Sequence, residues 1–169
     1  MPERPPSGAD FEGLLRTLAA ARVDFIAVGG IAAFAHGSAR LTLDLDVVYS
    51  RHTGNLDRLV AALAPLRPYL RGAPPGLPFH WDVDTLRRGL NFTLTTDLGD
   101  LDVLGEIAGG GGYDALRPHS TLTEVFGVEC LCLGLEKLIA VKRAAGRPKD
   151  LEAVAELEAI WEERRKRGL

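Results

Sequence analysis

The sequence predicts an α/β (α+β) fold, in which a small mixed β-sheet is flanked by helices and C-terminal helices pack on the core. Three observations predict it. A short apolar run at 25–28 ends in a Gly-Gly pair that opens a helix-like segment, residues 41–49 and 90–96 alternate in the manner of strands, and 134–169 has helical spacing. With 169 residues, 46% of them hydrophobic, the chain suits a single domain, 1–169.

The start of the chain is rich in proline, and we expect residues 1–9 to be disordered. Asp10 can then cap a first helix that ends near Arg22, because apolar residues follow it at helical spacing. No stretch resembles a signal-peptide core or approaches the roughly 20 apolar residues of a membrane helix. We therefore expect a cytoplasmic protein without a membrane partner.

Charge and cysteine content narrow the function classes. The net charge of -3 argues against general coating of nucleic acid, although a local basic cluster could still bind phosphates or an RNA end. Cys130 and Cys132 have neither the spacing of a zinc site nor a disulfide framework around them, which indicates reduced core residues.

The Gly29-Gly30 pair lies between a predicted strand and a predicted helix. The free N–H groups and the positive dipole end of such a helix favour a phosphate. Across 41–49, Thr42, Asp44 and Asp46 share one face of the next predicted strand. An isolated Asp-x-Asp often lies on a solvated edge strand without binding a metal. Here the neighbouring Gly29-Gly30 pair makes a functional site the better interpretation.

A third carboxylate is predicted on a hairpin. After a helix that begins at Thr53 or Asn55 and an irregular loop, the alternation at 90–96 leads through a turn into LDVLG. Asp102 lies between two apolar residues of the returning strand, where an unpaired charge would be costly. Asp100 is the alternative on the side of the turn.

The C-terminal part, 134–169, is predicted to be helical after a second hairpin. The segment GRPKD interrupts it, and Asp150 is expected to cap the last helix. Together the three aspartates suit nucleotidyl transfer, which needs oxygen ligands for two cations roughly 3.5 to 4 Å apart.

Three ordered motifs resemble one known family. The segment VGGIAAFAHGSARLTLDLDVV resembles the signature of nucleotidyltransferases related to DNA polymerase β, where Gly-Gly or Gly-Ser precedes Asp-x-Asp/Glu. GDLDVL lies in the place of the third acidic strand, and LIAVKRAAGRPKDL is similar to the C-terminal motif of small prokaryotic members, which include relatives of abortive-infection (type IV) toxins. The resemblance spans residues 23–155.

This resemblance implies the nucleotidyltransferase fold and a reaction dependent on two Mg²⁺ or Mn²⁺ ions. A nucleoside monophosphate would pass from a nucleoside triphosphate to a hydroxyl, with release of pyrophosphate. The metal-binding and catalytic residues would be Asp44, Asp46 and Asp102, and the last of these could accept the proton. The nucleotide- and phosphate-binding residues would be Gly29, Gly30, Arg40, Thr42, Lys142, Arg147, Lys149 and Asp150.

One departure leaves an alternative open. Gly30 stands where many active members have Ser, so a hydroxyl contact to the phosphates is missing from that position. The alternative is a catalytically inactive member that binds nucleotide or a partner as a regulatory module. The acceptor could be a small molecule, a protein or an RNA end such as that of tRNA, and a toxin or antitoxin partner or a homodimer is compatible with either hypothesis.

Overall fold

The computed structural model describes residues 8–169, so residues 1–7 of the expected disordered start lie outside it. Ala9, at the end of that start, donates its N–H to the carbonyl of Leu43 at 3.3 Å. The helices, in chain order, are α1 (Phe11–Ala20), α2 (Gly29–Ala35), α3 (Thr53–Leu63), η1 (Ala64–Leu66), α4 (Val83–Arg88), α5 (Tyr113–Leu116), η2 (Arg117–His119), α6 (Leu135–Ala145) and α7 (Pro148–Lys166). The strands are β1 (Phe25–Val28), β2 (Leu45–Tyr49), β3 (Tyr69–Leu70), β4 (Asn91–Thr96), β5 (Gly99–Leu104), β6 (Glu106–Ile107), β7 (Gly111–Gly112), β8 (Ser120–Val125) and β9 (Val128–Leu133).

The main sheet is mixed, as predicted, and has the strand order β3-β4-β5-β2-β1-β9-β8. Its central strand β2 runs parallel to β5 and antiparallel to β1, and β1 runs parallel to β9. Both predicted hairpins, β4–β5 and β8–β9, form its outer parts. The sheet thus brings strands that are distant in sequence, β2 and β5, side by side.

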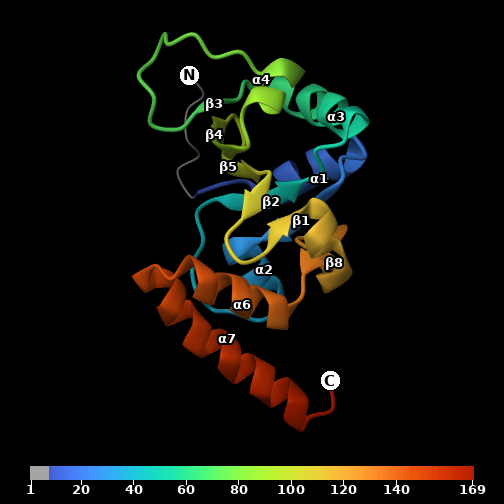
Figure 1. Ribbon diagram of the computed structural model, residues 1–169, viewed down its shortest axis with the longest axis vertical. Helices are drawn as coiled ribbons and strands as arrows, with labels where there is room; N and C mark the ends of the chain where they lie inside the picture. Colours follow the sequence, from blue (N-terminus) through green and yellow to red (C-terminus); the bar gives the residue numbers. More distant parts are fainter. Residues whose placement is uncertain (1–7) are drawn as a thin grey trace.

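Each face of the sheet has its own apolar layer. Leucines of α1 and α3 pack with one set of strand residues, including Ala27 and Val47. Residues of α2, α6 and α7 pack with the opposite set, including Ile26 and Val48. Alternate residues of β1 and β2 therefore pack into opposite layers. The helices α6 and α7 lie at one end of the molecule, opposite the loop between β3 and α4 (Figure 1).

The predicted strand at 41–49 is shorter than expected. β2 begins at Leu45, because its neighbours β1 and β5 offer partners only from that position onward. Leu41 and Leu43, which lie within the predicted strand, are 88% and 58% exposed. Asp44 therefore lies at the end of a loop rather than inside the strand.

Two other details differ from the sequence prediction. Gly29 and Gly30 are the first two residues of α2 instead of a separate turn before it. α7 begins at Pro148, with Arg147 as its N-cap, so Asp150 lies inside the first turn and is not the cap. Proline favours this earlier start because the first helical position needs no N–H donor.

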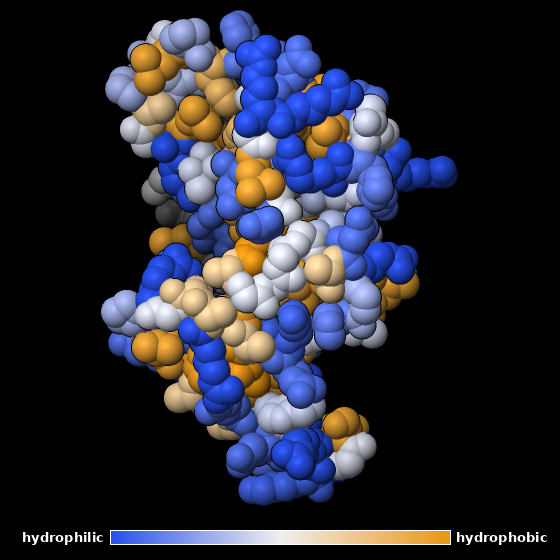
Figure 2. All heavy atoms as spheres, viewed as in Figure 1, coloured by the Kyte–Doolittle hydropathy of each residue, from blue (hydrophilic) through white to orange (hydrophobic). Residues whose placement is uncertain are grey.

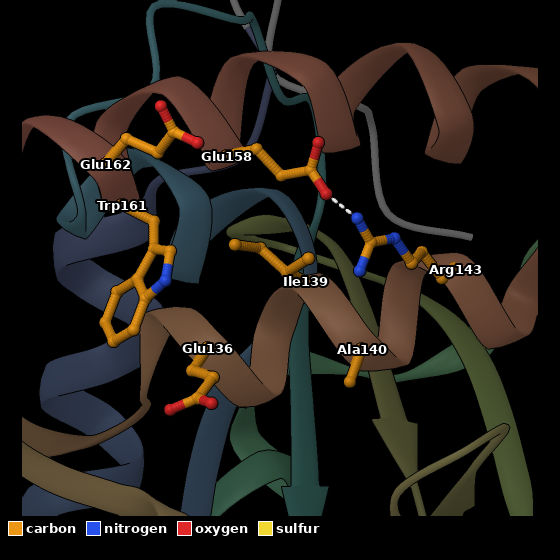
Figure 3. Close-up of a pocket in the computed structure, with 7 residues that line it drawn as sticks. All are labelled: Glu136, Ile139, Ala140, Arg143, Glu158, Trp161 and Glu162. Carbon is orange, nitrogen blue, oxygen red and sulfur yellow. Dashed lines mark ion pairs between the residues drawn. The ribbon is translucent and has the colours of Figure 1, made fainter.

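The two C-terminal helices pack against each other through an ion pair between Arg143 of α6 and Glu158 of α7, which is drawn in Figure 3. Beside it lies a cavity of about 430 Å³ that Trp161 and three glutamates help to line. The far end of α7 is mostly hydrophilic in Figure 2, as the charged sequence EERRKR predicts. Among residues 8–169, no helix is long and apolar enough to cross a membrane.

Candidate active site

Three carboxylates meet at the centre of the sheet. Asp46 and Asp102 are direct neighbours on the parallel strands β2 and β5, and Asp44 lies immediately before β2. One oxygen from each of the three lies within 4.8 Å of the others. The structure thus brings together the residues that the sequence nominated, and it selects Asp102 over Asp100 as the third member of this cluster, hereafter the aspartate trio.

Burial and nearby negative charge raise the pKa values of Asp44 and Asp46. The pKa of Asp46 is raised to about 8, first by burial and then by the charges of Asp44 and Asp102. The pKa of Asp44 is also raised, mainly by burial and by Asp102. A nearby cation would relieve both effects, since an opposite charge favours the ionised carboxylate.

The trio fits a divalent cation by its own chemistry. Oδ1 of Asp46 is buried and has no hydrogen-bond partner among the described residues. Convergent carboxylate oxygens are the ligands that Mg²⁺ and Mn²⁺ prefer. Asp44, Asp46 and Asp102 are therefore the residues that could hold such ions.

Gly29 is required beside the trio for two reasons. Its φ of +63° is in the left-handed region, which glycine adopts without the penalty of a Cβ atom. A Cβ atom at this position would also lie 2.2 Å from Oδ2 of Asp46. The backbone at the start of α2 consequently lies so close to Asp46 that only glycine fits at position 29.

A cavity of about 510 Å³, hereafter the polar cavity, opens at this point. Its lining includes ten of the eleven predicted site residues, namely Gly29, Gly30, Arg40, Thr42, Asp44, Asp46, Lys142, Arg147, Lys149 and Asp150. The eleventh, Asp102, lies next to Asp46 in the sheet. The polar cavity therefore combines a carboxylate end with a cationic end.

Asp150 organises the cationic end. It is 3% exposed and accepts hydrogen bonds from Arg147, the shorter of them 2.6 Å, while Nζ of Lys142 lies 4.0 Å away. Burial alone would raise the pKa of Asp150, but these cations lower it overall. The pKa of Lys142 is lowered by burial, against the opposing effect of Asp150 and Asp46. The charges of both Asp46 and Asp150 thus favour the protonated form of Lys142.

A second cavity of about 330 Å³, hereafter the apolar cavity, adjoins the first. The two share Gly29, Asp46, Lys142, Arg147 and Asp150. The remaining lining of the apolar cavity is mainly aliphatic and includes Leu104, Ile107, Leu138 and Val141, together with the polar residues Asn91 and Glu106. Asp46 and Lys142 consequently border two compartments of different character.

Arg71 is a site residue that the sequence did not reveal. It follows β3 in a segment predicted only as irregular loop, yet its guanidinium contacts Asp102 at 2.6 Å and lies within 3.5 Å of Asp44. No spacing rule links position 71 to the two motifs that carry these aspartates. The only available signal was the need of buried carboxylates for a counter-charge.

Comparison with known proteins identifies the fold. No protein-family model matches the chain, and no curated protein matches it in sequence. Among solved structures, the lincosamide antibiotic adenylyltransferase LnuA bound to lincomycin has a TM-score of 0.58 at 12% identity, covering 89% of this chain and 95% of that one. The antibiotic-resistance factor ANT(2'')-Ia has a TM-score of 0.54 at 15% identity, covering 93% and 90%. A further structure of ANT(2'')-Ia, in complex with adenylyl-2''-tobramycin, has a TM-score of 0.52 at 14% identity, covering 94% and 97%. The chain has the fold of these nucleotidyltransferases over nearly its whole length.

Proposed function

We propose that this chain is a nucleotidyltransferase that moves a nucleoside monophosphate from a nucleoside triphosphate to a hydroxyl acceptor and releases pyrophosphate. The observation that carries the proposal is the convergence of Asp44, Asp46 and Asp102 beside Gly29 and a cation-lined cavity. The fold comparison supports it, because LnuA is an adenylyltransferase and one ANT(2'')-Ia structure contains adenylyl-2''-tobramycin. Fold alone does not fix activity, so the proposal depends on the site.

The cationic end of the polar cavity is suited to the triphosphate. Arg40, Lys142, Arg147 and Lys149 supply positive charge, and the first N–H groups of α2 have no partner within the helix. The hydroxyl of Thr42 and the buried carboxylate of Asp150 complete this end, the latter by holding Arg147 in place.

The trio is suited to the transfer itself. The acceptor oxygen forms a bond to the α-phosphorus while the bond from that phosphorus to the bridging oxygen breaks, and pyrophosphate takes the bonding electrons. Asp102 receives the proton of the acceptor hydroxyl, directly or through water. Divalent cations held by Asp44, Asp46 and Asp102 would lower the pKa of the acceptor hydroxyl and stabilise the charge of the leaving pyrophosphate.

The two compartments suit two substrates. The polar cavity, with its cations, suits the triphosphate, and the apolar cavity provides a separate space that meets it at Asp46. Mg²⁺ or Mn²⁺ is the expected ion and ATP one candidate donor. The motif LIAVKRAAGRPKDL supports a role in a toxin–antitoxin or defence system, with a cognate partner protein, within a single domain spanning 1–169.

The deciding experiment measures pyrophosphate release from each of the four nucleoside triphosphates, with Mg²⁺ or Mn²⁺ and cell extract as the source of acceptor. Asp46→Asn should reduce release at least roughly 100-fold. Asp57→Asn, an exposed aspartate on α3, is the matched control and should leave release unchanged. Absence of release by the unmodified protein, together with metal-dependent nucleotide binding, would instead support the inactive regulatory module.

A further inference from the structure

Arg71 is held in place by the backbone of the neighbouring strand. Its own N–H donates to the carbonyl of Thr93 at 2.9 Å, which continues the pairing of β3 with β4. One guanidinium nitrogen, NH2, donates to the carbonyl of Leu94 at 2.9 Å. These bonds direct the side chain from the edge strand across β4 toward β5.

The guanidinium distributes its three nitrogens over three carboxylates. NH2 lies 2.6 Å from Asp102, NH1 lies 3.5 Å from Asp44, and Nε lies 3.3 Å from Asp100. Only 23% of the Arg71 side chain is exposed, so solvent screens these charges weakly. A planar guanidinium can meet several carboxylates at fixed angles, which a lysine ammonium on a flexible stem cannot do.

We infer that Arg71 is a positioning residue of the aspartate trio, which holds Asp102 and Asp44 in their converged arrangement while its charge opposes divalent cations at the same carboxylates. The inference rests on the proposed function for its effect on turnover, but its effect on metal binding stands independently. Like charges within 4.8 Å repel, and the nearby guanidinium offsets part of that repulsion.

This dual role has a diagnostic consequence. Removal of the guanidinium takes away one positive charge beside the aspartate trio. Divalent cations are then repelled less and bind more tightly. The same removal leaves Asp102 without its 2.6 Å hydrogen bond from the guanidinium, so Asp102 can still bind a cation but is less well oriented toward the acceptor hydroxyl, and turnover falls. A residue that merely supported the local fold would weaken metal binding and turnover together.

The test compares Arg71→Ala, Arg71→Lys and the matched control Arg67→Ala. Arg67 precedes β3 and pairs with Asp97 at 2.7 Å, outside the trio. Binding of Mn²⁺ is measured from the electron paramagnetic resonance signal of the free ion, and turnover from pyrophosphate release. Circular dichroism establishes that each variant is folded.

We expect Arg71→Ala to bind Mn²⁺ roughly three- to tenfold more tightly and to turn over about 10- to 100-fold more slowly. Arg71→Lys keeps the charge, so its Mn²⁺ affinity should stay near that of the unmodified protein while its turnover falls. Arg67→Ala should change neither quantity. Weaker or unchanged Mn²⁺ binding by Arg71→Ala overturns the inference, as does unchanged turnover in an active enzyme.

If Arg71→Ala does not fold, Arg71→Lys decides: a turnover equal to that of the unmodified enzyme, or a loss of Mn²⁺ binding, overturns the inference. If the unmodified protein releases no pyrophosphate from any nucleoside triphosphate, the proposed function fails. The Mn²⁺ measurement on Arg71→Ala still tests the inference in that case, because it needs no turnover.

Discussion

Thr42 occupies the space that a side chain on residue 30 would need. A Cβ atom built on Gly30 would lie 2.6 Å from Oγ1 of Thr42 and 2.8 Å from its Cβ. The second contact involves the stem of the side chain, so rotation of the Thr42 hydroxyl cannot relieve it. A hydroxyl is therefore present beside position 30, supplied by Thr42 in the loop before β2.

The first prediction concerns this pair of residues. Gly30→Ser should lower the free energy of unfolding by about 1 to 3 kcal/mol, because it overpacks the contact with Thr42. Combining it with Thr42→Gly, which removes the clashing Cβ atom together with the hydroxyl, should recover most of that loss. Denaturant titration of both single variants and the double variant gives the coupling energy. Additive effects, with no recovery in the double variant, would show that the two positions are independent.

A second prediction concerns Gly29. Gly29→Ala combines a left-handed φ with a Cβ atom 2.2 Å from Asp46, so it should both destabilise the chain and displace a metal-binding carboxylate. We expect Mn²⁺ affinity to fall by about tenfold or more. Gly127→Ala is the control, since Gly127 has a φ of +76° but no neighbour within 4 Å of the added Cβ. Equal loss of Mn²⁺ binding in both variants would contradict this explanation.

The parts of the site that follow from local pattern were predictable. Alternation at 90–96 and the turn after it placed Asp102 on a returning strand, and the Gly29-Gly30 pair marked the start of α2. Strand order was not accessible in the same way, because the pairing of β2 with β5 depends on contacts between residues more than 50 positions apart. The expectation that Asp102 lies near Asp44 and Asp46 came from the resemblance of the ordered motifs to a known family, and local propensity could not have supplied it.

The residues that the sequence misplaced share one physical cause. The exposed Leu41 and Leu43 continue the alternation of β2, but no neighbouring strand extends far enough to pair with them. Arg71 lies in a proline-rich loop whose sequence does not specify where a long side chain ends. In both cases tertiary pairing, which a single sequence does not display, decided the outcome.

The third prediction concerns Cys130 and Cys132. Both thiols are buried, and burial raises their pKa values to about 11 and about 12. Because the thiolate is the reactive species, neither should react with a thiol reagent at pH 8 while the chain is folded. In denaturant both should react at the rate of a free cysteine. Rapid reaction of the native protein would contradict the burial of β9 in the core.

The last prediction uses the raised pKa of Asp46. An unfolded aspartate titrates near 3.8, whereas Asp46 in the fold titrates near 8, so between these values the folded state binds more protons than the unfolded state. In the metal-free protein, the contribution of Asp46 to the free energy of unfolding is therefore fully present below pH 3.8 and is lost as the pH rises toward 8. Asn at this position has no charge to desolvate. Asp46→Asn should therefore flatten the decline in stability from pH 5 to pH 8.

Denaturant titrations in a chelator, at pH 5, 6, 7 and 8, would measure this effect, with Asp57→Asn as the control that retains the decline. Adding excess Mn²⁺ should stabilise the unmodified protein most at pH 8, because the cation binds the ionised trio. It should not stabilise Asp46→Asn to the same extent. Parallel pH profiles for the unmodified protein and Asp46→Asn in chelator would contradict the raised pKa of Asp46 and would mean that the charge of Lys142, which opposes that rise, outweighs burial.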